Sequence, residues 1–306
     1  MEMFEPGTLE ERIGYLKKAS NLKETLEEVE AYAINKLKDA GLEHSYDVIA
    51  HEVPDFITMG YTEYATNFVF QPLSLSAREA MMVDALHDDC ETTDYTSLLR
   101  DNIKNNKANK YQDRNDPDGK YVPKKILVVL PGSNKLKQKV CLNKLKEVNK
   151  IHKGDVLFKP HPITTHAVIG ELKDLFGEDA VLPRDTDIYY YLQKAEKVYT
   201  THMSESAIYA VALGKTIEPI DVFNDVHMSS FYNINRILFA HQDKGGEIIN
   251  KMLSSYKSGC INPNIDKDWR NKVDKYIEYI LDYKSKHKGW YIIKDKENVK
   301  KEIQGD

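Results

Sequence analysis

Two prolines flank a histidine in the segment Lys159-Pro160-His161-Pro162. The apolar run 155–158 directly before it predicts a short strand, so His161 is expected just beyond a strand end. The prolines stiffen the turn and keep it out of helical conformation. An imidazole held in this way can hydrogen-bond a diphosphate or act as a general acid toward a leaving phosphate. The alternative is a histidine packed in a loop and bonded to backbone.

A second polar segment, Thr200-Thr201-His202-Met203-Ser204-Glu205-Ser206, follows another predicted strand. Ser204 or Thr201 is expected to be the N-cap of a helix over 204–213. Free N–H groups at such a helix end attract anions, so the segment predicts a phosphate cradle. The alternative is ordinary capping of an α/β unit. Gly214 is expected to end this helix.

The elements that position these segments alternate regularly from residue 125 onward. Apolar, β-branched runs alternate with helical patterns of about ten residues, which predicts βαβ units around a parallel sheet. Ligands of such sheets bind outside the carboxyl ends of the strands, where both polar segments fall. The predicted strands are 125–130, 155–158, 180–182, 197–200 and 216–220, and the predicted helices are 136–150, 165–176, 188–195 and 204–213.

The first hundred residues carry weaker patterns, and a polar stretch over 101–123 reads as a linker. An amphipathic pattern over 8–40 predicts one or two helices, and short strands are expected at 46–51 and near Ile57 and 68–70. We predict an N-terminal acceptor-side α/β domain over 1–110, a linker over 111–123, a nucleotide-binding Rossmann-like domain over 124–264, and a C-terminal helix and tail over 265–306 that pack back on the N-terminal domain.

An acid or a histidine near a strand end of the N-terminal region could act as a general base that deprotonates a hydroxyl group. His51 and Asp55 are the candidates, with Glu52 between them. A helix predicted to begin at Ser76 ends near His87, Asp88 and Asp89, which are weaker candidates. Each of these residues is more often an ordinary surface side chain.

The loop after the last predicted strand contains four residues that could ligate a metal. Their spacing matches no standard metal cage, so we predict no metal and favour a solvated loop that lines the acceptor side. The residues are Asp221, Asn224, Asp225 and His227.

Composition excludes several classes of protein. The chain has 306 residues, of which 41% are hydrophobic and 30% charged, so it can bury a core and is not an intrinsically disordered chain. No apolar run approaches the roughly 20 residues that a membrane span needs, and the acidic N-terminus is no secretory signal. Three scattered cysteines predict reduced thiols. We therefore expect a cytoplasmic protein.

The net charge of −5 conceals an asymmetry along the chain. Residues 1–101 carry 8 basic and 21 acidic side chains, whereas residues 102–160 carry 15 and 5. One interpretation is that two solvated surfaces attract each other. The other is that the basic middle faces an anion such as a nucleotide phosphate, an acidic polysaccharide or DNA.

The two polar segments together resemble a known family. A Lys-Pro-His-Pro turn, followed some 40 residues later by a Ser/Thr-rich strand end and a helix that ends with Ala210, Gly214 and Lys215, is similar to the C-terminal domain of GT-B glycosyltransferases of the bacterial polysialyltransferase and capsule Kdo transferase group. The related teichoic-acid glycerophosphotransferases share the pattern. The resemblance covers about residues 125–225.

The resemblance implies a GT-B-like α/β fold of two Rossmann-type domains, with a nucleotide-sugar donor as co-substrate and no other cofactor. His161 would contact the donor phosphate or assist its departure, and Ser204 and Ser206 would bind phosphate or ribose. The other residues placed at the donor are Lys159, Gly132, Ser133, Thr201, His202 and Glu205. Tyr209 stands where many members have a glutamate that binds ribose, which leaves the donor base open.

The sequence thus predicts a glycosyltransferase that moves a sugar from a CMP-, CDP- or UDP-linked donor to a hydroxyl. The acceptor is a saccharide or a hydroxymethylated base in double-stranded DNA, since the short, Asn-, Lys- and Tyr-rich chain fits a bacteriophage enzyme. Two alternatives stay open. One is a sugar-nucleotide epimerase, and the other is a non-catalytic nucleotide-binding interaction module.

Overall fold

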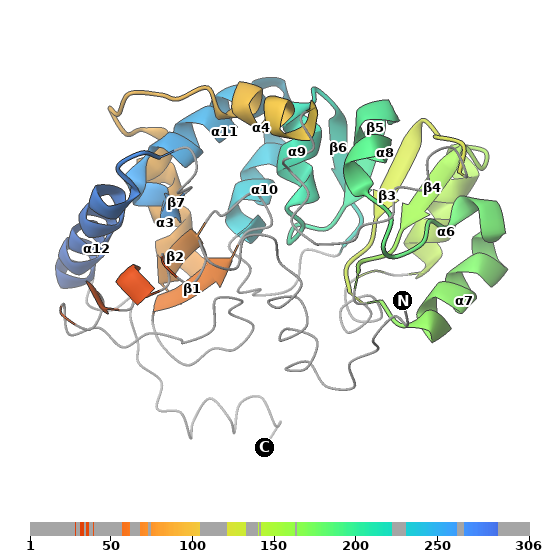
Figure 1. The fold of residues 1–306 in the computed structure, drawn as a ribbon, viewed down its shortest axis with the longest axis horizontal. Helices are drawn as coiled ribbons and strands as arrows, with labels where there is room; N and C mark the ends of the chain where they lie inside the picture. Colours follow the sequence, from red (N-terminus) through yellow and green to blue (C-terminus); the bar gives the residue numbers. More distant parts are fainter. Residues whose placement is uncertain are drawn as a thin grey trace, which may run out of the picture. The chain divides into compact units, whose positions relative to one another are not determined.

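The chain divides into two units in a computed structural model. The parallel-sheet unit comprises Met1–Lys23, Asp94–Asp225 and Ile234–Ile249, and the antiparallel-sheet unit comprises Glu24–Thr93, Val226–Asn233 and Asn250–Asp306. Figure 1 labels their helices and strands. The residues that the structure describes are 28, 31–33, 35–36, 39, 57–61, 68–72, 75–104, 121–132, 140, 142–162, 164–221, 231–261 and 266–286.

A four-stranded parallel sheet forms the centre of the first unit, in the order β4-β3-β5-β6. β3 (Ile126–Val129) pairs with β4 (Val156–Lys159) and β5 (Lys197–Thr200), and β5 pairs with β6 (Thr216–Pro219). Every residue of β3 and β4 is buried, as expected for parallel strands covered on both faces. The predicted α/β class with a parallel sheet is confirmed.

Helices connect the strands at nearly the predicted positions. The predicted strand at 180–182 is present only as a single bridge between Val181 and Phe158. α4 lies within this unit, although the sequence places it before the predicted linker. The helices are α4 (Tyr95–Lys104), α6 (Leu142–Ile151), α7 (His166–Phe176), α8 (Ile188–Lys194) and α9 (Ser206–Ala212), with the 3-10 helices η1 (Glu178–Ala180) and η2 (Gln242–Lys244).

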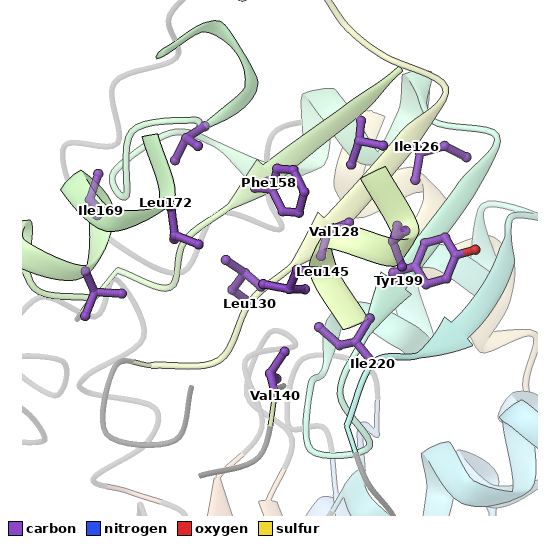
Figure 2. Packing of buried hydrophobic residues seen from close by; sticks show 14 residues of the cluster. Ile126, Val128, Leu130, Val140, Leu145, Phe158, Ile169, Leu172, Tyr199 and Ile220 are labelled. Atoms are coloured by element: carbon purple, nitrogen blue, oxygen red, sulfur yellow. The ribbon is translucent and has the colours of Figure 1, made fainter. Parts of the chain in front are cut away.

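A hydrophobic cluster packs α6 and α7 against one side of the sheet. Figure 2 shows its side chains gathered around β3 and β4. Alternate residues of β3 and β4 enter it, because successive strand residues point to opposite faces. Phe158 stacks on Phe176 of α7 with ring centroids 4.1 Å apart. The members on the sheet and on α6 and α7 include Ile126, Val128, Leu130, Leu145, Val148, Val156, Phe158, Ile169 and Leu172.

Two further helices, α10 (Phe231–Ala240) and α11 (Gly245–Ser254), each contain a point of division between the units. At Gly245 a Cβ atom would lie 2.6 Å from Cγ1 of Val211 on α9, so only glycine allows α11 to approach α9 this closely. α4 also packs against α9. Helix α9 is therefore held by two neighbours besides the sheet.

The second unit contains an antiparallel sheet in the order β1-β2-β7. Only six residues separate β1 from β2, and a parallel crossover needs a dozen or more. The described part of this unit therefore departs from the predicted second Rossmann-type domain, and the complete GT-B arrangement stays a prediction. The elements are β1 (Ile57–Tyr61), β2 (Phe68–Pro72), α3 (Leu75–Leu86), η3 (Tyr256–Ser258), β7 (Cys260–Ile261) and α12 (Trp269–Lys286).

Contacts within the second unit join segments that are far apart in the sequence. The hydroxyl of Tyr279 on α12 donates to Asp84 of α3 at 2.6 Å. The ammonium of Lys257 lies 2.8 Å from Asp88, and this pairing together with a hydrogen bond from Ser255 lowers the pKa of Asp88 despite its burial, which works in the opposite direction. α12 thus contacts α3 through Asp84, whereas the predicted division of the chain into domains stays a prediction.

Several predictions fall outside the described residues: the strand at 46–51, most of the helical pattern over 8–40, and residues 111–120 of the linker. None of the helices in the described ranges is both long and apolar enough to cross a membrane.

Candidate functional site at the carboxyl edge of the parallel sheet

The strand order places a change of direction between β3 and β5. From β3 the chain moves outward to β4, then returns across β3 to reach β5 and continues to β6. In open α/β sheets the crevice at the carboxyl ends of the strands on either side of such a reversal is the usual ligand site. The loops that begin at Leu130 and Thr201 flank this point, and the loop that begins at Pro160 is adjacent.

Lys159, the last residue of β4, is a buried cation with only 2% of its surface exposed. Its ammonium donates to the carbonyl oxygen of Pro160 at 2.6 Å and to that of Arg184 at 2.9 Å. Lys159 therefore braces the turn that carries His161 against the segment 183–186. Its predicted contact with donor phosphate stays a prediction.

Arg184 is the second buried cation at this edge, with 4% of its surface exposed. Its guanidinium donates to the carbonyl oxygen of Thr164 at 2.7 Å and lies 3.3 Å from Nε2 of His166. The backbone N–H of Thr164 in turn donates to the carbonyl of His161 at 2.9 Å. These hydrogen bonds fix the positions of the two cations beside the His161 turn.

His202 and Asp221 form a close pair beyond the ends of β5 and β6. Nδ1 of His202 lies 2.7 Å from Oδ1 of Asp221, and the backbone N–H of His202 donates to both carboxylate oxygens at 3.0 and 3.2 Å. The two side chains are 8% and 7% exposed. The expectation of a solvated loop was therefore wrong for Asp221, because its carboxylate is buried against His202 in the loop after β5.

An asparagine on α10 holds the same loop from its other side. Nδ2 of Asn235 donates to the carbonyls of His202 at 2.8 Å and Ser204 at 2.7 Å. The ring of Phe239, one turn further along α10, meets the His202 ring edge to face at 4.9 Å. The His202 ring thus contacts one carboxylate and one aromatic ring, and one amide holds its backbone carbonyl.

The start of α9 differs from the prediction. The helix begins at Ser206, its N-cap residue is Glu205 with helical dihedral angles, and no side chain caps it. Thr201 and Ser204, the residues expected at the N-cap, instead form a turn in which the Ser204 N–H donates to the Thr201 carbonyl at 3.0 Å. Oγ of Ser204 accepts from the N–H of Ser206 at 3.3 Å. Thr201 and Glu205 are buried. Gly214, at φ +72°, follows the helix as predicted.

Four buried oxygen atoms near this edge find no hydrogen-bond partner within the described part of the chain. Most buried polar atoms in native proteins have a hydrogen-bond partner. A group of buried oxygens without one therefore marks a place where water or a ligand can bind. The four are Oγ1 of Thr164, Thr186 and Thr200 and Oδ1 of Asn235.

The remaining predicted site residues are dispersed or lie outside the described ranges. Gly132 is buried at the end of the β3 loop. Asp88 takes part in the contacts of the second unit, and His87 and Asp89 are exposed there. Ser133, His51, Glu52, Asp55, Asn224, Asp225 and His227 lie outside the described residues. Within the described ranges no three His, Cys, Asp or Glu side chains cluster as metal ligands would.

A hollow of about 440 Å³ lies at the opposite, amino edge of the sheet. Exposed charges line it and pair with each other: the Lys125 ammonium lies 2.9 Å from Glu196, and this contact raises the pKa of Lys125. Nε2 of His152 lies 3.0 Å from the hydroxyl of Tyr199. The lining residues are Lys125, Ile126, His152, Asp155, Glu196, Lys197 and Thr216.

The chain has limited similarity to known proteins. No family model matches the chain, and no curated protein matches it. Among solved structures, a β-Kdo 2,7-transferase, KpsC of Thermosulfurimonas dismutans, is similar over 62% of this chain and 68% of its own, with 17% identity and a TM-score of 0.36. We draw no functional conclusion from a similarity of this size.

Proposed function

We propose that the protein is a glycosyltransferase whose nucleotide-sugar donor binds with its phosphates at the carboxyl edge of the parallel sheet. The observation that carries the proposal is the pair of buried cations, Lys159 and Arg184, next to the His161 turn. Positive side chains at this edge attract an anionic ligand. The resemblance of the two polar segments to GT-B enzymes supports the same reading.

The span of the site suits a nucleotide diphosphate or monophosphate with its sugar. Neighbouring strands are about 4.8 Å apart, so the loops after β4 and β5 are roughly 10 Å apart across β3. His161 serves one end of this span and His202 the other. The hydroxyl of Thr200, for which the described residues supply no partner, offers a further hydrogen bond at the end of β5.

In the proposed reaction the bond between the anomeric carbon and the donor phosphate oxygen breaks, and its electron pair stays on the phosphate. The acceptor oxygen bonds to the anomeric carbon and loses its proton to a base. The buried cations and the His161 imidazole stabilise the charge that develops on the leaving phosphate. We propose His51 or Asp55 as the base, as the sequence predicts.

The acceptor is proposed as a saccharide hydroxyl, with the hydroxymethylated base of double-stranded DNA as the second candidate. The described part of the basic segment supports the second candidate only in a general way. Lys146, Lys150 and Lys153 are exposed on and just after α6, and such a surface would bind a phosphate backbone with strong salt dependence.

Thermal unfolding with CMP, CDP, UDP, GDP and ADP, each with and without Mg²⁺, tests the donor site. A nucleotide at about 100 times its Kd adds about 2.7 kcal/mol of stability. We expect a pyrimidine nucleotide to stabilise the wild-type protein. The variant His161→Ala should bind it more weakly, and His241→Ala, which changes an exposed histidine after α10, should behave as wild type.

Turnover of the matching nucleotide sugar separates the proposal from its alternatives. A transferase releases nucleotide rapidly only when a saccharide or modified DNA acceptor is added. Conversion of the donor to an isomer without acceptor would instead identify an epimerase. Binding with no turnover would favour an interaction module, and no stabilisation by any nucleotide would contradict the donor site itself.

A further inference from the structure

Helices α6 and α7 cover the same side of the parallel sheet. Leu145 of α6 and Ile169 and Leu172 of α7 enter one hydrophobic cluster there (Figure 2). Each helix therefore has a second face that is directed away from the sheet. These two outward faces are neighbours, because α6 follows β3, α7 follows β4, and β3 pairs with β4.

The outward faces carry opposite charges. Lys146 and Lys150 are exposed on α6 and lie four residues apart, which places them on one face. Glu171 and Asp174 are exposed on α7 and lie three residues apart. Each face is thus complementary in charge to the other face and repels a copy of itself.

The charges of opposite sign within each helix are paired locally. Glu147, the acid of α6, lies 3.3 Å from the ammonium of Lys144. Lys173, the lysine of α7, lies 2.6 Å from Glu178. The outward faces therefore keep their basic and acidic character.

Gly170 leaves a shallow place in the outward face of α7. It lies four residues before Asp174, so the two share a face. Glycine inside a helix costs stability relative to alanine, and the described residues do not require it here: its φ is not positive, and a Cβ atom would meet nothing within 4 Å among them. The missing side chain allows a second chain to approach closely.

Large apolar side chains are exposed beside both sets of charges. Ile151, next to Lys150 at the end of α6, is 59% exposed, and Leu175, next to Asp174 in the last turn of α7, is 41% exposed. Each helix runs back from the carboxyl edge, so both of these ends lie toward the amino edge of the sheet. Burial of apolar surface favours association, and the charges select the partner.

We propose that the outward faces of α6 and α7 are the interface of a symmetric dimer, in which α6 of each chain packs on α7 of a second copy. A two-fold axis parallel to the helices produces both contacts at once, because it exchanges the two helices and preserves their direction. It sets Lys150 opposite the partner's Asp174, with Ile151 near the partner's Leu175. This inference does not depend on the proposed function.

The first measurement is the mass of the full chain by analytical ultracentrifugation. Two helices of about 15 Å offer an interface at the small end of specific complexes, so we expect a dissociation constant of roughly micromolar order. The mass should rise from one chain toward two between about 1 and 200 µM, and less so in about 0.5 M salt. A mass of one chain throughout, or a mass that grows beyond two chains, would overturn the proposal.

Charge reversal tests the pairing of α6 with α7. Lys146→Glu combined with Lys150→Glu makes both faces acidic, and Glu171→Lys combined with Asp174→Lys makes both basic. We expect each folded double variant alone to dimerise at least tenfold more weakly than the wild type. An equimolar mixture should recover the dimer, because every α6 then meets an α7 of opposite charge. A mixture that associates no better than its components would contradict the pairing.

Two further variants separate the interface from general effects. Gly170→Gln introduces a helix-favouring side chain that meets no described neighbour, so the fold should be at least as stable while dimerisation weakens at least tenfold. Lys275→Glu combined with Glu278→Lys, at exposed positions of α12, should dimerise as the wild type does. Unchanged dimerisation of Gly170→Gln would overturn the proposal even if the charge-reversed chains fail to fold.

A nucleic-acid phosphate backbone is a poorer occupant of this surface, because the acids of α7 stand beside the lysines of α6 and would repel it. Binding of a short DNA duplex to the wild type and to Lys146→Glu combined with Lys150→Glu tests this occupant. A wild type that stays monomeric and loses DNA affinity on this substitution would overturn the dimer.

Discussion

The two edges of the parallel sheet carry similar residue types and arrange them in opposite ways. At the amino edge, exposed or half-buried lysines and glutamates pair with one another, as Lys125 does with Glu196 and Lys197 with Glu218. At the carboxyl edge, Lys159 and Arg184 are buried and donate to backbone carbonyls. Asp221, an acid at that edge, contacts a histidine.

The difference shows why the hollow at the amino edge is not the better candidate site. Exposed opposite charges satisfy each other and are screened by water and salt, so they offer little to a ligand. A buried charge acts more strongly on a ligand, because the effective dielectric constant is lower there. The comparison therefore ranks the carboxyl edge first by chemistry, although the amino edge holds a cavity of about 440 Å³.

A matched pair of lysine substitutions tests this contrast most strongly. Lys159→Met removes a charged donor from two buried carbonyls and is expected to lower the free energy of unfolding by about 2–3 kcal/mol. Lys197→Met, at the start of β5, breaks a surface ion pair and is expected to cost about 1 kcal/mol or less. Urea unfolding of the two variants provides the measurement. Equal losses would remove the distinction between the edges.

A pair of glycine substitutions tests whether α9, which follows the His202 loop, is held by close packing. Gly245→Ala forces a methyl group against Val211 and should destabilise the protein by about 1–3 kcal/mol. Gly246→Ala is the control, because its Cβ would meet Thr96 at an ordinary 3.7 Å, and it should be neutral or stabilising by up to about 1 kcal/mol. Thermal unfolding of both variants decides the matter, and a neutral Gly245→Ala would show that α9 can shift freely.

The smallest expected effect concerns the ion pair at the amino edge. A double-mutant cycle on Lys197 and Glu218 should give a coupling of about 0.2–1 kcal/mol. That coupling should shrink as ionic strength rises from 0.05 to 0.5 M, since the Debye length falls below the reach of exposed charges. A coupling that is larger than this, or independent of salt, would mean that the amino edge is as poorly solvated as the carboxyl edge.

Much of the parallel-sheet unit could be predicted because its strands are buried on both faces. Such strands read as short continuous apolar runs, and 197–200 was predicted with the bounds that the structure gives. The start of α6 was placed six residues too early, because apolar and lysine residues between 136 and 141 continue the helical pattern. In place of the predicted strand at 180–182, the structure has a single bridge between Val181 and Phe158.

The site itself was predicted in part. The loops that carry His161 and His202 follow from their place after strands, which local sequence reveals. The partners of these residues do not: Asp221 lies 19 residues from His202 and Asn235 lies 33, and only the folded sheet and α10 bring them together. Arg184 was missed for the same reason, because nothing in its own segment indicates that Lys159 and Thr164 surround it.

Asn235 has a practical consequence, because its amide group is a natural reporter of the site. Both donor contacts of its Nδ2 go to backbone carbonyls, and its side chain is entirely buried. Exchange of these two hydrogens with deuterium requires the loop to open locally. Their exchange rate, followed by NMR in heavy water, therefore reports local opening of the His202 loop in the unmodified protein.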